Sequence, residues 1–73
     1  MMEFKDKVKT ARLKLYLSQE SLAKELGIAF ATVNRWETGA HLPTLMMQKK
    51  FFEFCSRNGI EFDNQLTNTK RKI

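Results

Sequence analysis

Residues 19–36 constrain the fold of this chain more than any other segment. Their sequence, QESLAKELGIAFATVNRW, predicts two short helices joined by a tight turn. Gly27 follows the last apolar residue of the first helix, where glycine adopts a left-handed C-cap at little cost. Ala23 is small where the two helices would cross, and Val33 is apolar where the second helix must face the first. This spacing predicts a helix-turn-helix.

Further positions extend the motif and give the chain a resemblance to a known family. The segment LSQESLAKELGIAFATVNRWETG resembles the DNA-binding domains of phage repressors and Cro proteins, the XRE-like type. The resemblance is strongest over residues 4–45. It implies an all-α fold, a compact bundle of four to five short helices of the lambda repressor-like type, with the helix-turn-helix at residues 19–37. The agreeing positions are Leu17-Ser18-Gln19, Leu22-Ala23, Leu26-Gly27-Ile28, Val33, Arg35-Trp36-Glu37, Gly39 and Pro43.

Composition limits the class of protein. The 73 residues suffice for one domain with a small core. No apolar run approaches the roughly 18 residues of a membrane span, and the N-terminal sequence MMEFKDKVK is too charged for a signal peptide. We therefore expect a cytoplasmic protein with one DNA-binding domain over residues 1–66 and a flexible basic tail over residues 67–73.

The sequence contains no pattern typical of a catalytic or metal site. One cysteine, Cys55, and one histidine, His41, are too few for a metal cluster or a Cys/His nucleophile. Cys55 is interpreted as a small core residue and His41 as an exposed loop residue. We expect no enzymatic activity, no cofactor and no small-molecule ligand. The net charge of +5 is compatible with a polyanionic partner.

The resemblance makes residues 30–38 the recognition helix of a protein that binds double-stranded DNA in the major groove. Asn34 can bond the N6/N7 edge of adenine, and Arg35 can bond guanine or a phosphate. Ala31 would lie against a thymine methyl group and Thr32 near a phosphate. The start of the preceding helix corresponds to a phosphate contact of the family. The expected DNA-binding residues are Gln19, Phe30, Ala31, Thr32, Asn34 and Arg35.

Phe30 departs from the family pattern, which commonly has a polar base-reading residue at this position. Three interpretations stay open: contact with thymine methyl groups, burial in the core, or contact with a protein partner. Ala29 also stands where the family has a serine or threonine N-cap, a loss of about 1 kcal/mol for the helix start. Both departures support an alternative function, a protein-interaction module that keeps the helix-turn-helix without reading bases.

The first helix, expected over about residues 3–15, carries a second implication of the resemblance. Arg12 and Glu37 match a family position pair that forms a largely buried ion pair, which we expect here as a structural link. The lysines of this helix are assigned to its solvated side: Lys5, Lys7, Lys9 and Lys14. Tyr16 follows the helix where a positive φ would be strained, so we expect this turn to differ from the family.

A last helix, expected over about residues 44–58, has an apolar stripe wider than a small core requires. Part of the stripe is either core or covered by the tail or by a second subunit, with Met47, Phe51 and Phe54 as candidates for a homodimer interface. Ile60 and Phe62 are expected to lie back on the domain, and Asp63 to cap a final turn. A symmetric dimer would read a palindromic operator, as a transcriptional regulator and repressor.

Overall fold

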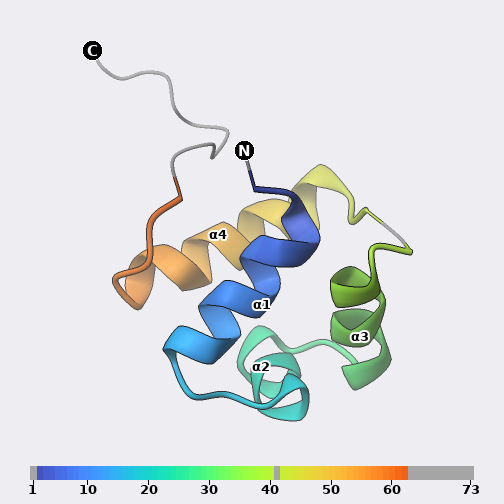
Figure 1. Ribbon diagram of the computed structural model, residues 1–73, viewed down its shortest axis with the longest axis horizontal. Helices are drawn as coiled ribbons and strands as arrows, with labels where there is room; N and C mark the ends of the chain where they lie inside the picture. The colour runs from blue at the N-terminus through green and yellow to red at the C-terminus, as the bar shows by residue number, and fades with distance from the viewer. Residues whose placement is uncertain (1, 41, 63–73) are drawn as a thin grey trace.

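The chain folds into four helices in a computed structural model that describes residues 2–40 and 42–62. They are α1 (Phe4–Lys14), α2 (Gln19–Leu26), α3 (Phe30–Thr38) and α4 (Leu45–Arg57), and the described ranges contain no strand. The expected all-α fold is confirmed. In Figure 1, α1 crosses α4 on one side of the molecule, and α2 and α3 form the other side. No helix in these ranges is long and apolar enough to cross a membrane.

Local sequence signals fix where most helices begin and end. The side chains of Ser18 and Thr44 accept backbone N–H bonds of 3.0 and 3.3 Å at the starts of α2 and α4. Gly27, with φ of 70°, and Gly39, with φ of 80°, end α2 and α3 in the left-handed region. Ala29 precedes α3 and forms no side-chain cap bond, although its carbonyl accepts from the backbone N–H groups of Thr32 and Val33 at 3.0 and 3.4 Å.

Aromatic rings join three of the helices in the core. The ring of Phe4 in α1 lies edge-on to Trp36 of α3 at 5.4 Å and to Phe51 of α4 at 5.3 Å. Phe51 is completely buried, so this cluster lies at the centre of the domain. The remaining core residues are Val8, Ala11, Leu22, Ala23, Leu26, Val33, Phe54, Cys55 and Ile60.

Lys7 is buried, and the prediction that it lies on the solvated side of α1 is wrong. Its side chain is only 7% exposed, and its ammonium lies 5.3 Å from the ring centre of Phe52 and 5.8 Å from that of Phe62. Ile60 is buried and Phe62 is half-buried, so the segment after α4 lies back on the domain as expected. This returning segment covers Lys7, and a cation–π attraction offsets part of the burial cost.

Tyr16 adopts the left-handed conformation in the turn after α1, although a positive φ is strained for tyrosine. Its φ is 56°, and its side chain is 95% exposed, so no side-chain burial offsets the strain. The backbone N–H of Leu17 donates to the carbonyl of Arg12 at 2.9 Å and closes the turn. The chain therefore keeps the turn geometry of a helix that ends on glycine, with tyrosine in the glycine's place.

The wide apolar stripe of α4 is mostly core. Phe51 and Phe54 are 0% and 4% exposed, and Met47 is half-buried against the core, so the two phenylalanines offer no surface to a second subunit. Exposed apolar side chains lie instead before and at the start of α4, at Leu42, Leu45 and Met46. The predictions for His41, for Asp63, for the domain end at residue 66 and for the tail over residues 67–73 lie outside the described residues.

Candidate nucleic-acid interface

Helix α3 has one buried face and one face open to solvent. Val33 and Trp36 are 0% and 3% exposed and fix the helix against α1 and α2. Thr32 is half-buried beside them. The exposed face carries the remaining recognition-helix residues expected to contact bases, which are Phe30, Ala31, Asn34 and Arg35. The structure thus brings these four side chains to one surface.

The buried end of α3 is held by the Arg12–Glu37 ion pair that the family resemblance implies. Arg12 Nε donates to Glu37 Oε2 at 2.7 Å, and Nη2 donates to Oε1 at 3.0 Å. Arg12 Nη1 donates to the carbonyl of Leu17 at 3.1 Å. The two charged side chains are 15% and 8% exposed. This bidentate geometry ties the end of α1 to the end of α3.

The charge on Glu37 is stabilised although the carboxylate is buried. Desolvation by burial raises the pKa of Glu37, but hydrogen bonds from Arg12 and Gln19, with attraction to Arg12 and Lys9, lower it by more. The net pKa of Glu37 lies below its ordinary value. The hydrogen bond that Arg12 donates to Glu37 raises the pKa of Arg12. Both groups are therefore charged at neutral pH.

Gln19, the expected phosphate contact, links the ion pair to the exposed face of α3. Its Nε2 donates to Glu37 Oε1 at 3.1 Å, and its Oε1 accepts from Asn34 Nδ2 at 3.2 Å. Gln19 is half-buried at the first position of α2. The sequence carried no signal for this link, because it depends on how α2 and α3 cross. One continuous series of hydrogen bonds therefore joins four side chains, which we call the polar relay: Arg12, Glu37, Gln19 and Asn34.

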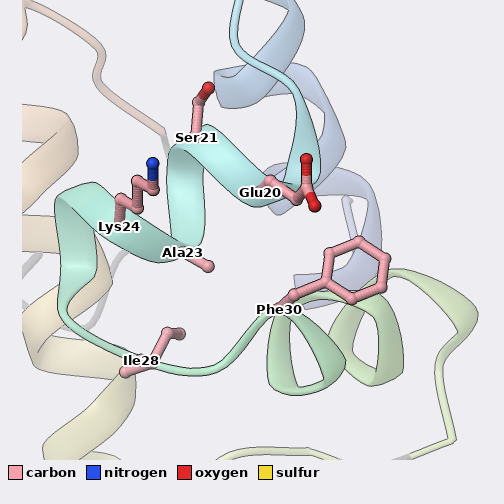
Figure 2. Close-up of a pocket in the computed structure, with 6 residues that line it drawn as sticks. All are labelled: Glu20, Ser21, Ala23, Lys24, Ile28 and Phe30. Atoms are coloured by element: carbon pink, nitrogen blue, oxygen red, sulfur yellow. The ribbon is translucent and has the colours of Figure 1, made fainter.

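Phe30 stands beside a hollow between α2 and the start of α3. Figure 2 shows its ring directed away from the helix, with the carboxylate of Glu20 nearby and Ile28 on the connecting turn. The other lining residues are Ser21, Ala23 and Lys24. Phe30 is 49% exposed, so burial in the core is excluded as its role. Contact with thymine methyl groups and contact with a protein partner both stay open.

The described part of the chain contains no candidate metal site. Residues 2–40 and 42–62 contain no group of histidine, cysteine and carboxylate side chains that could hold a metal ion. Burial, with a smaller contribution from the carboxylate of Glu61, raises the pKa of the buried Cys55 thiol to about 12. A thiol in that environment is a structural group, because only the thiolate is nucleophilic.

Comparison with known proteins places the chain in a family. A family model described as helix-turn-helix matches residues 8–55, well over half of the chain and the whole of α2 and α3. No curated protein and no solved structure gives a significant match. The matched region covers the ion pair, the capped turn and the exposed face of α3. The chain belongs to the Cro/C1-type helix-turn-helix family.

Proposed function

We propose that this protein is a transcriptional regulator, a repressor, that binds double-stranded DNA sequence-specifically with α3 in the major groove. The observation that carries the proposal is the exposed face of α3 on a helix whose opposite face is fixed in the core. The major groove of B-DNA admits an α-helix and presents a distinct donor and acceptor pattern for each base pair. The family match agrees with this role.

The side chains on this face match the chemistry of base edges. Asn34 reads adenine, and Arg35 reads guanine or binds a phosphate. Ala31 and Phe30 are apolar and exposed, and they contact thymine methyl groups. Thr32, near the start of α3 where Ala29 offers no side-chain cap, binds a phosphate at the N-terminal end of this helix. Gln19 completes the set as a phosphate contact from α2.

The operator that fits this proposal is palindromic and is read by a symmetric dimer. Such a dimer places its two recognition helices about 34–36 Å apart, one helical turn of DNA. Leu42, Leu45 and Met46 are 70%, 70% and 79% exposed and neighbour one another in the sequence. They support the dimer better than the buried Phe51 and Phe54, since exposed apolar patches are typical of protein contacts.

Selection from a random pool of duplex DNA, at two salt concentrations, tests the proposal. We expect a palindromic consensus that is lost when Asn34 and Arg35 are both replaced by alanine. Arg57→Ala is the matched charge control, because the C-terminal end of α4 lies across the molecule from α3 (Figure 1). Binding without a consensus, weakening steeply with salt, would leave only backbone contacts and refute base readout.

Phe30 favours a second candidate function, the protein-interaction module. A half-exposed aromatic ring beside a hollow is typical of a contact that anchors a protein partner. This function predicts no duplex binding even at low salt. It also predicts that Phe30→Ser abolishes binding to a protein partner while Asn34→Ala and Arg35→Ala leave that binding unchanged.

A further inference from the structure

We infer that Gln19 is a positioning residue for base readout: anchored by Glu37, it turns the Asn34 amide so that this side chain selects adenine. The inference rests on the proposed function, because it concerns the base that Asn34 reads. It gives the Arg12–Glu37 pair a role in specificity besides its structural one. The polar relay passes the orientation from Glu37 to Gln19 and from Gln19 to Asn34, which then presents it to the base.

The first step fixes the orientation of Gln19. Glu37 is ionised beside Arg12, and an ionised carboxylate only accepts hydrogen bonds. The Gln19 group that lies 3.1 Å from Glu37 Oε1 must therefore be its NH₂ group. The carbonyl oxygen of Gln19 then points to the other side, toward α3. A charged acceptor that is itself held by two bonds from Arg12 makes this orientation strongly preferred.

The second step fixes the orientation of Asn34. The Gln19 oxygen is an acceptor, so the Asn34 group at 3.2 Å from it is the NH₂ group. The reversed amide would bring two carbonyl oxygens together and lose the bond. One NH₂ proton of Asn34 is used by Gln19, whereas the other proton and the carbonyl oxygen stay free. Asn34 is exposed, so both free groups are open to a ligand.

The third step connects this orientation to a base. Adenine presents an acceptor, N7, beside a donor, the N6 amino group, in the major groove. The free N–H and oxygen of Asn34 match that pair in a bidentate contact. Guanine presents two acceptors and leaves the Asn34 oxygen unpaired, while thymine and cytosine each offer only one partner. A fixed amide presents its donor and its acceptor in one order and therefore favours adenine, whereas an amide free to turn could present its NH₂ group to guanine or thymine, or its oxygen to cytosine.

The same geometry separates this role from that of a simple phosphate contact. A residue that only binds phosphate weakens binding to all sequences equally when it is removed. A residue that orients Asn34 changes the relative affinities for the four bases at one position of the operator. The two roles of Gln19, phosphate contact and orientation of Asn34, therefore differ in one measurable ratio. This is the affinity for the adenine operator divided by the affinity for an operator with another base at that position, and it does not depend on overall binding strength.

The experiment compares wild-type protein with Gln19→Met, which keeps side-chain length but cannot hydrogen-bond as an amide. Dissociation constants are measured for the selected operator and for operators with each other base pair at the Asn34 position. Wild-type protein should prefer adenine by about tenfold or more, and Gln19→Met should reduce this preference to within about threefold. The preference at the Arg35 position should persist in both proteins and is the internal control.

A second comparison shows that the effect passes through Asn34. In an Asn34→Ala background, Gln19→Met should leave the base ratios unchanged, because no amide remains to be oriented. Thermal unfolding checks that Gln19→Met is folded. If it is not, Gln19→Ala takes its place. Equal weakening for all four bases, with the adenine preference intact, would overturn the inference. Failure of wild-type protein to select any consensus would instead refute the proposed function.

Discussion

Replacing Arg12 by methionine tests how strongly the polar relay holds α1 to α3. The substitution removes three hydrogen bonds, of 2.7 and 3.0 Å to Glu37 and of 3.1 Å to the carbonyl of Leu17. Glu37, only 8% exposed, is then left charged with a single donor from Gln19. Breaking one half of a buried ion pair costs about 3–5 kcal/mol. That is a large part of the roughly 5–15 kcal/mol that stabilises a typical domain.

Chemical and thermal unfolding, followed by the fluorescence of the buried Trp36, measure this loss. Each kcal/mol shifts the Tm of a domain this size by about 4–8 °C, so the Tm should fall by at least about 12 °C. The double variant Arg12→Met/Glu37→Leu should recover most of the loss, because two apolar side chains leave no unpaired buried charge. The destabilisation caused by Arg12→Met should also shrink toward acidic pH, where protonation neutralises the stranded Glu37.

The result that would refute this reasoning is a loss below about 1 kcal/mol that does not change with pH. Such a value is typical of a solvent-exposed ion pair. It would mean that water replaces Arg12 around Glu37 at little cost. A double variant as unstable as the sum of the two single variants would refute the coupling in the same way.

Four further predictions concern single groups. Because the pKa of Glu37 is lowered from its ordinary value of 4.5, its contribution to wild-type stability should be complete above that pH. It should be lost as the pH falls through the folded pKa, as measured by urea unfolding across pH 2–7. Tyr16→Gly should raise stability by up to about 1 kcal/mol in urea unfolding, because glycine relieves the strain of a positive φ. Ala29→Ser should raise it by about 1 kcal/mol by adding an N-cap to α3, and an unchanged urea midpoint would argue against this cap. Cys55 should resist alkylation at neutral pH and react in denaturant, as measured by mass spectrometry, because burial raises its pKa to about 12.

Local signals explain why the helix-turn-helix could be predicted so closely. In the structure α2 ends immediately before Gly27, as the sequence predicts, and α3 coincides with the predicted recognition helix over residues 30–38. Ser18 and Gly27 cap α2, and Gly39 ends α3, each through contacts with residues close in the chain. Capping depends on side-chain chemistry within one turn of the helix end. A sequence therefore contains nearly all the information that these boundaries need.

Non-local contacts decide burial that the sequence predicted wrongly at Lys7 and left open along α4. Lys7 occupies a position that helical periodicity assigns to solvent, and it is buried because Phe62 returns from beyond α4 to cover it. The turn at Tyr16 is a local case, because Tyr16 keeps a strained φ so that the N–H of Leu17 reaches the Arg12 carbonyl five residues earlier. Phe51 and Phe54 belong to the core because two other helices also contribute rings to it. The burial of Lys7, Phe51 and Phe54 depends on where distant segments of the chain meet.

The polar relay shows how these two kinds of information combine at the candidate site. The family resemblance specifies Arg12 and Glu37, and helical periodicity specifies that Asn34 faces outward. Neither states that the Gln19 amide spans the gap between them, since this requires α2 and α3 to cross with two hydrogen bonds of 3.1 and 3.2 Å. Because Glu37 fixes one end of the relay by its charge, the orientation of the base-reading amide follows from an ion pair in the domain interior. Stability and base preference should consequently change together for substitutions of Glu37, and separately for substitutions of Asn34.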